Sequence, residues 1–168
     1  MTLALAGCAG GEEEPSSEET GTEESSSVCT GDTFDCTEEF AQTVLSELEE
    51  SGNTPEPIDA GVYKTEEGEA EPGTAMVFAA FDLTNETTLG RQIGNMVFGP
   101  MYENWPDYPD TDRFWFRVFP TTDAEDFRTD MYVERWWIEG LRDGDFTTDE
   151  IADNILDTST QPLSGVVN

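Results

Sequence analysis

Histidine is absent from this chain of 168 residues, and lysine occurs only once, at Lys64. Without an imidazole there is no Ser-His-Asp or Cys-His catalysis, no histidine metal site and no side chain that normally titrates near neutral pH. Seven basic residues are too few to cover a phosphate backbone or an anionic headgroup layer. We therefore expect no nucleic-acid partner and no electrostatic adsorption to lipid.

Acidic residues dominate every part of the chain. The 38 Asp and Glu residues give a formal net charge of −31, and residues 37–168 alone hold 29 acidic side chains against all seven basic ones. Repulsion of this size destabilises a compact state in dilute buffer, whereas about 1 M salt shortens the screening length to roughly 3 Å. We therefore expect a domain that needs salt. Acidity combined with one lysine is similar to the composition of haloarchaeal proteins; the alternatives are an acidic mimic of DNA or a high-capacity calcium buffer.

The chain opens with a short apolar segment that ends at a cysteine. Leu5-Ala6-Gly7-Cys8 resembles a lipobox, the signal-peptidase site at which the cysteine becomes the lipidated first residue of a lipoprotein. A secretory signal usually has a basic start and an apolar stretch of roughly 7–15 residues. Only seven residues precede Cys8, and none of them is basic. Either the signal starts upstream of Met1, or the tetrapeptide is accidental.

Residues 9–28 are polar and acidic. They include seven Glu, five Ser and three Gly, with no aromatic residue. Such a segment buries too little apolar surface to offset its ordering entropy, so we expect a disordered tether that holds a domain away from a surface. The lipobox, the tether and the acidity together resemble haloarchaeal surface lipoproteins. That resemblance implies a lipid anchor at Cys8 on the extracellular side of the cell membrane; the alternative is a cytoplasmic protein with a frayed start.

Cys29 and Cys36 are the other two cysteines. If Cys8 carries a lipid, they form an even pair, and we expect a disulfide between them. Closing so short a loop contributes on the order of 2–3 kcal/mol, and the bond persists only outside the reducing cytosol. Free thiols are the alternative. A zinc site is disfavoured because it needs about four ligands and the chain has no second cysteine pair and no His.

The folded part follows Cys36, because 17 of the 18 aromatic residues lie after it. About 120 residues are ample for one domain, and no repeat or long linker divides them. Hydrophobic periodicity and capping residues predict the elements. The first is a helix capped by Asp35 or Thr37 and ended by Gly52, followed by an edge strand at 58–64, turns at 66–73 and a central strand at 76–81. Next comes a helix that is capped by Thr84 or Asn85 and is stopped or kinked at Gly99-Pro100. A strand at 113–119 and helices at 131–142 and 148–156 complete the domain.

These elements indicate an α+β fold, a small sheet faced by about four helices in a single domain. Asn85-Glu86-Thr87 is an N-glycosylation sequon, which makes Asn85 a candidate glycosylation site on a surface protein. The predicted organisation is 1–8 for the signal-peptide remnant and lipobox, 9–28 for the tether, 29–160 for the α+β domain and 161–168 for a C-terminal tail.

Residues 142–151 resemble the second half of an EF-hand calcium loop. The first half of such a loop is missing, so the oxygen ligands fall short of the roughly 6–8 that calcium needs. We favour a structural role, in which Gly144 ends one helix and Thr147 or Thr148 caps the next, and we predict no metal site. The weak cation candidates are Asp143, Asp145 and Glu150.

Three carboxylates lie within six residues, beside an aromatic side chain. Acids next to an aromatic ring are typical of a sugar or cation platform, and paired carboxylates can perform glycoside hydrolysis. Chance clusters are expected in so acidic a chain, so the favoured interpretation is a solvated surface loop. The candidate binding residues are Trp105, Asp107, Asp110 and Asp112.

Trp115, Phe119, Trp136 and Trp137 form a second aromatic group. Aromatic side chains are enriched in binding sites as well as in cores. We favour a core role for all four.

The leading hypothesis is a lipid-anchored surface lipoprotein of a halophile whose small α+β domain binds a partner protein or small solute, without a cofactor and without catalysis. The domain is smaller than a typical two-lobed solute receptor, so docking to a membrane complex is favoured over transport. Two other classes stay open. One is a soluble cytoplasmic acidic protein that binds a basic partner or mimics nucleic acid. The other is a surface hydrolase that uses carboxylates such as Asp107, Asp110 and Asp112.

Overall fold

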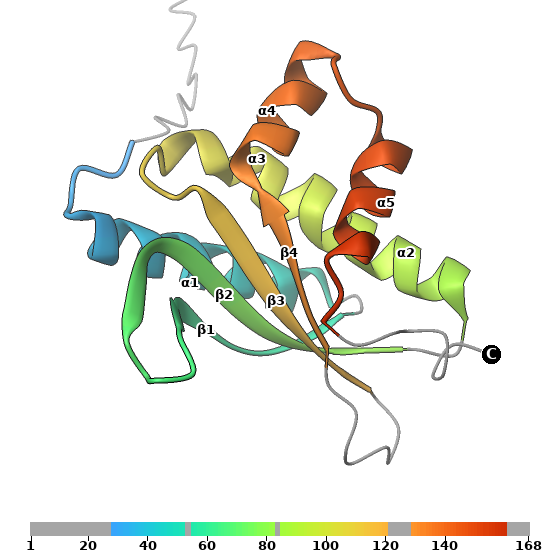
Figure 1. Ribbon diagram of the computed structural model, residues 1–168, viewed down its shortest axis with the longest axis horizontal. Helices are drawn as coiled ribbons and strands as arrows, with labels where there is room; N and C mark the ends of the chain where they lie inside the picture. Colours follow the sequence, from blue (N-terminus) through green and yellow to red (C-terminus); the bar gives the residue numbers. More distant parts are fainter. Residues whose placement is uncertain (1–27, 53–54, 83–84, 121–128, 161–168) are drawn as a thin grey trace, which may run out of the picture.

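The computed structural model describes residues 28–52, 55–82, 85–120 and 129–160. They form one mixed four-stranded sheet with helices against it (Figure 1), which confirms the α+β fold and the expected number of main helices. The strand order is β1-β2-β3-β4, with antiparallel outer pairs and a parallel β2–β3 pair. The elements are α1 (Thr33–Ser51), β1 (Glu56–Lys64), β2 (Ala70–Phe81), α2 (Glu86–Met96), α3 (Tyr102–Asn104), β3 (Arg113–Pro120), β4 (Thr129–Glu134), α4 (Arg135–Asp143) and α5 (Thr148–Asp157).

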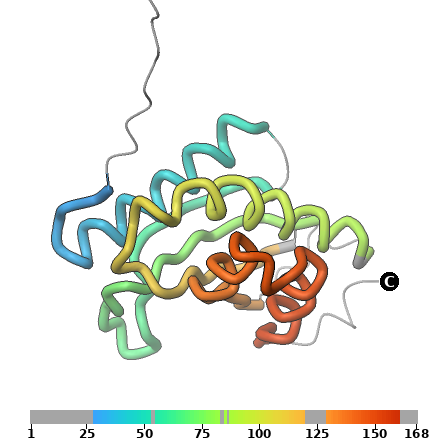
Figure 2. Tube along the Cα trace, turned by 90° about the horizontal axis from the view of Figure 1, so that it is seen from above, coloured from blue at the N-terminus to red at the C-terminus, as the bar shows by residue number. Residues whose placement is uncertain are grey.

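The hydrophobic core lies between one face of the sheet and the helices α1 and α2. Alternate residues of the inner strands, such as Val77 and Phe116, are fully buried on this face. Phe40 of α1 and Ile93 of α2 belong to the same buried cluster. Figure 2 shows α1 and the run from α2 to α3 side by side. α5 lies against α2 and β4, and its Ile151 and Ile155 belong to the same buried cluster. No described helix runs across the second face of the sheet, although Trp137 of α4 stacks there on Tyr132 with ring centroids 6.0 Å apart.

α1 begins earlier than the sequence predicts. Its N-cap is Asp32, whose carboxylate accepts a hydrogen bond from the backbone N–H of Asp35 at 2.9 Å. The expected caps Asp35 and Thr37 were therefore wrong: both lie inside the helix, and the Thr37 hydroxyl instead accepts from the N–H of Gly73 at 3.1 Å. Gly52 ends α1 as expected, with a left-handed φ of 59° that costs glycine no Cβ clash.

Residues 131–134 were predicted to open a helix, and this was wrong because they belong to β4. Met131 and Val133 are fully buried on the core face, while Tyr132 and Glu134 lie on the opposite face and are only half-buried. This alternation has the period of two that a strand requires. The helix starts only at Arg135.

The first two strands are longer than expected. β1 is the predicted edge strand and begins at Glu56, two residues before the expected start. β2 is the predicted central strand but begins at Ala70, so the expected turn region at 66–73 ends earlier. Both extensions follow from their mutual pairing, in which Lys64 is opposite Ala70 and Glu56 opposite Ala80.

The run from α2 to α3 is kinked at Gly99-Pro100 and continues beyond it. Of the two outcomes expected from the sequence, a stop or a kink, the structure shows the kink. Pro100 has no N–H to donate to the preceding turn, and the turn Val97–Met101 is π-helical. In it the N–H of Tyr102 reaches the carbonyl of Val97 five residues back. A single widened turn of this kind is the usual way in which a helix absorbs one extra residue.

The Cys29–Cys36 disulfide is formed, as predicted. It joins the residues that lead into α1 to the first turns of that helix. The Cys29 N–H also donates to the carbonyl of Asp107 at 2.7 Å. The chain therefore enters the domain at a point held by a covalent bond and by a hydrogen bond.

Candidate functional site

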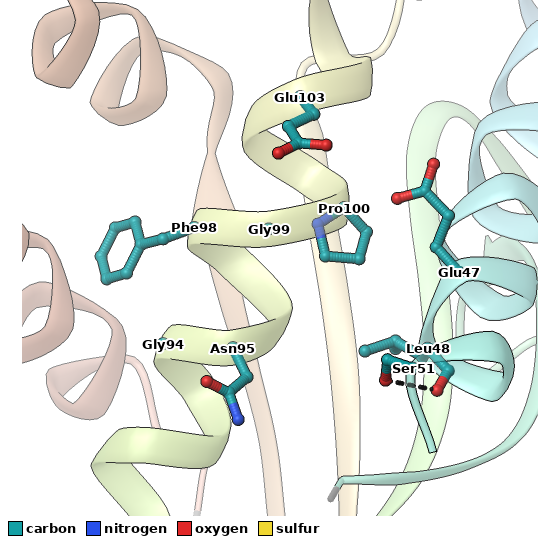
Figure 3. Close-up of a pocket in the computed structure, with 9 residues that line it drawn as sticks. All are labelled: Glu47, Leu48, Ser51, Gly94, Asn95, Phe98, Gly99, Pro100 and Glu103. Atoms are coloured by element: carbon teal, nitrogen blue, oxygen red, sulfur yellow. Dashed lines mark hydrogen bonds between the residues drawn. The ribbon is translucent and has the colours of Figure 1, made fainter. Parts of the chain in front are cut away.

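A cleft of about 580 Å³ lies between α1 and the run from α2 to α3. Figure 3 shows the side chains that line it, with α1 on one side and the kinked run on the other. The lining residues are Glu47, Leu48, Ser51, Gly94, Asn95, Phe98, Gly99, Pro100 and Glu103.

The cleft exists because the wall opposite α1 is made of small residues around the kink. Gly94 and Gly99 have no side chain to fill the space. The Phe98 ring lies along Gly94, where a Cβ would be 3.7 Å from the ring, and it points away from α1 (Figure 3). Leu48 and Pro100 then form an apolar floor between the two walls.

Two carboxylates, from Glu47 and Glu103, line one end of the cleft and point towards the space beside Pro100 (Figure 3). The side-chain amide of Asn104 donates to Glu47 Oε1 and to the Pro100 carbonyl, both at 2.8 Å. This amide holds the α1 carboxylate against the opposite wall. None of the nine lining residues is basic, so the cleft suits a positively charged group that also carries apolar surface.

The second face of the sheet carries an aromatic layer. Gly61, Met76, Trp115 and Tyr132 are register neighbours across the four strands. Tyr63 stacks on Trp115 with ring centroids 5.3 Å apart, and Tyr132 packs on the other side of Trp115 at 4.8 Å. Trp115 Nε1 is buried there and has no hydrogen-bond partner among the described residues. We call this surface the aromatic face; it comprises Tyr63, Met76, Phe78, Arg113, Trp115, Arg117, Phe119, Asp130, Tyr132 and Glu134.

Two ion pairs frame the aromatic face. Arg117 donates from Nε and Nη2 to the two oxygens of Asp130, each at 2.7 Å, and Arg113 binds Glu134 Oε1 at 2.6 Å from Nη2. These hydrogen bonds to carboxylates raise the pKa of both guanidinium groups above the usual arginine value. The face therefore carries matched charges, unlike most of this acidic chain.

The core role predicted for the second aromatic group is confirmed only for Trp137, which is buried. Trp115 and Phe119 are half-buried on the aromatic face, because their positions in β3 alternate with core residues such as Phe116. Trp136 is 57 % exposed and packs its ring against Trp137 with centroids 5.8 Å apart.

Trp105 is not available as a binding platform, which corrects the expectation from the sequence. Its side chain is only 1 % exposed. The indole N–H donates to the carbonyl of Thr111 at 2.7 Å, and the ring packs against Phe40 and Phe114. Trp105 is therefore a core residue that fixes the loop after α3.

The three candidate carboxylates lie on the loop between α3 and β3, with Asp110 and Asp112 exposed and Asp107 half-buried. Their backbone groups tie this loop to its neighbours: the Asp112 N–H donates to the Gly73 carbonyl and its carbonyl accepts from Arg135 N–H, each at 2.8 Å. Within the described residues no group of three His, Cys, Asp or Glu side chains is arranged to hold a metal ion. The structure therefore shows an anchoring loop.

The residues of the weak cation candidate form a helix connection, which is the interpretation that the sequence favoured. Gly144 ends α4 with a φ of 83°, and Thr147 caps α5. Glu150 accepts hydrogen bonds from the N–H and hydroxyl of Thr147, which lowers the pKa of Glu150. Asp143 and Asp145 are exposed beside this capping box.

Two modification candidates have different outcomes. Asn85 is the N-cap of α2 and is exposed, and its side chain accepts from the Thr88 N–H at 2.8 Å. The expected cap is confirmed, whereas glycosylation stays a prediction. Cys8 lies outside the described residues, as do nearly all of the predicted tether and the whole of the predicted tail at 161–168.

The cleft was missed by the sequence reasoning. Its one local signal is the spacing of Gly94, Gly99 and Pro100, which predicts a bent helix with a bare side but not what faces it. None of the described helices is long and apolar enough to cross a membrane. No protein-family model, curated protein or solved structure matches the chain.

Proposed function

We propose that this chain is a lipid-anchored surface lipoprotein of a halophile whose domain binds a partner protein in the cleft between α1 and α2. The disulfide carries the extracytoplasmic part of this proposal. A bond between Cys29 and Cys36 persists outside a reducing compartment. It stands at the point where the predicted tether from Cys8 meets the domain. The 20 residues from 9 to 28 would span at most about 70 Å when extended, so the partner must come that close to the membrane.

The cleft supports a protein partner rather than a small solute. A site for a small molecule usually encloses most of the ligand surface. Here Leu48 is the only lining side chain that is buried, and polar residues such as Asn95 and Glu103 are exposed at the surface. A groove with an apolar floor and an acidic rim instead fits one apolar and one basic side chain of a protein segment. The proposal therefore assigns binding, and no catalysis, to the domain.

The anchor is tested by a Cys8→Ser variant expressed in a halophilic host with the upstream coding region restored. The wild-type protein is expected to partition into detergent and to have an intact mass that starts at a lipid-modified cysteine. The variant is expected to stay in the aqueous phase, because it lacks the thiol that would carry the lipid. The same mass measurement reports whether Cys29 and Cys36 are oxidised. An unmodified, soluble and reduced wild type would support the cytoplasmic alternative.

The cleft is tested by photo-crosslinking on the cell surface. A photoreactive residue at Asn95, which is exposed in the cleft, is expected to yield one defined protein adduct, whereas the same residue at Asp153 on α5 is not. Replacing both Glu47 and Glu103 by Gln removes the two charges of the cleft and should weaken the adduct by about five- to tenfold, since exposed ion pairs contribute roughly 1 kcal/mol. Equal adducts from both positions, or an adduct insensitive to the charges, would contradict this assignment.

A further inference from the structure

From the aromatic face we infer that this chain forms a symmetric dimer in which the face packs against the same face of a second copy. The inference concerns a surface on the side of the sheet opposite to the α1–α2 cleft, and it does not depend on the proposed partner. No described helix crosses this face, although it carries Trp, Tyr and Arg side chains. These three residue types are the ones enriched at energetically important positions of protein interfaces.

Hydrogen bonds within the chain engage part of each edge of the sheet, which disfavours association by adding strands there. On β1, the Ala60 carbonyl accepts from Gln42 and the Ala60 N–H donates to Asp59 Oδ1. On β4, the Tyr132 N–H donates to the hydroxyl of Thr158. The Asp130 N–H likewise donates to the hydroxyl of Thr160, and the Asp130 carbonyl accepts from the Thr160 N–H. Natural sheets protect their edges by such devices.

Charge selects a second copy as the occupant of the face. α1 and α5 contain no basic residue and many acidic ones, so these sides of two molecules repel each other. On the aromatic face the charges are paired, and the arginines are more exposed than their carboxylates: Arg117 is 26 % and Asp130 is 19 % exposed. At the face itself, a second copy therefore meets paired charges and no excess of carboxylates.

The face is also self-complementary, as a two-fold interface requires. Nη1 of Arg117 donates to no group of the described residues, and the Asp130 oxygens that Arg117 binds retain further lone pairs. Each copy thus offers a donor and an acceptor that the other can use.

Gly61 provides a gap on the face that a test can use. It is opposite Met76 in the register, in the same row as Trp115, and a Cβ placed on it would meet no atom within 4 Å. Gly61 lines a hollow of about 370 Å³ with Met76, Phe78 and Arg117 of the face and with Phe34 and Glu38 of α1. A larger residue is therefore compatible with the single copy and would change the surface against which a second copy packs. Gly90 on α2 is equally open and lies on a helix at the opposite side of the sheet. It provides a matched control.

The experiment is sedimentation equilibrium of the full chain carrying Cys8→Ser in about 3 M NaCl, where the screening length is below roughly 3 Å. We expect a species of twice the 18.6 kDa chain mass. Gly61→Gln should raise the dissociation constant by at least about tenfold, which corresponds to about 1.4 kcal/mol, while Gly90→Gln leaves it unchanged. Circular dichroism verifies that each variant is folded. If Gly61→Gln fails to fold, Ala80→Gln takes its place. Ala80 lies in β2 on the same side of the sheet as Met76 and Phe78.

Three results would overturn the inference. The first is a wild type that stays monomeric up to millimolar concentration. The second is a dimer that Gly61→Gln and Ala80→Gln both leave intact, which would place self-association on another surface. The third is crosslinking from Tyr63 on cells that yields only an adduct with a different protein, which would show that another partner occupies the face.

Discussion

Replacing Trp105 by Ala is expected to lower the free energy of unfolding by about 3–5 kcal/mol, the range for truncation of a large buried aromatic residue. The side chain is 1 % exposed, and its ring contacts Phe40 of α1 and Phe114 of β3. Its removal therefore leaves a cavity where three elements meet. The loss is a large part of the roughly 5–15 kcal/mol that stabilises a typical domain.

Trp136→Ala is the matched control, because it removes the same side chain from a site that is 57 % exposed. It is expected to cost at most about 1.5 kcal/mol, since the ring contacts only Trp137 and Phe146 among the aromatic residues of the described part. Trp105→Phe keeps an aromatic ring but removes the hydrogen bond to the Thr111 carbonyl. It should lower the free energy of unfolding by an amount between those of the two alanine variants. Urea unfolding in molar salt measures all three. Equal effects at positions 105 and 136 would contradict the core placement.

Trp105 also shows where reasoning from the sequence stops. Its neighbours along the chain are Pro106 and Asp107, which favour an exposed loop. Its burial depends on Phe40 and Phe114, which lie outside that local window. Local patterns give no information on such contacts, so Trp105 was placed in a solvated surface loop and named as a candidate binding residue.

Elements with one clear period were predicted well, and elements with two competing periods were not. β3 alternates over its whole length, and α5 has a cap and an apolar stripe, so both were found within about two residues. Residues 131–142 combine a two-residue alternation at Met131 and Val133 with a helical pattern after Arg135. The helical pattern was extended over both. The pairing of β4 with β3, which decides between them, is a contact between distant segments.

The candidate cleft was beyond prediction for the same reason. Pro100 and its preceding glycine indicated a bend, but the cleft arises only where that bend faces Glu47 and Leu48 of α1. The aromatic face was partly visible, since Trp115 and Arg117 alternate with core residues in β3. The sequence does not show that helices cover one face and leave the other uncovered.

Lowering the salt concentration from about 3 M to about 0.1 M is expected to unfold the full chain, because the screening length grows from below 3 Å to about 10 Å. Two effects oppose each other. Ion pairs of the described residues, namely Arg113–Glu134, Arg117–Asp130 and Arg135–Glu139, strengthen at low salt, but each such pair contributes at most about 1 kcal/mol. Seven basic residues cannot neutralise 38 acidic ones, so repulsion among the excess carboxylates prevails.

A salt titration followed by circular dichroism and tryptophan fluorescence measures this transition. The variant Glu49→Gln/Glu50→Gln should shift its midpoint to lower salt, because both carboxylates lie in the last turn of α1, where the helix dipole disfavours negative charge. Arg117→Gln should shift the midpoint in the opposite direction, because it leaves Asp130 without its bidentate partner. A cooperative fold that persists at 0.1 M salt in all three proteins would show that hydrophobic burial outweighs the net charge of −31 without help from screening.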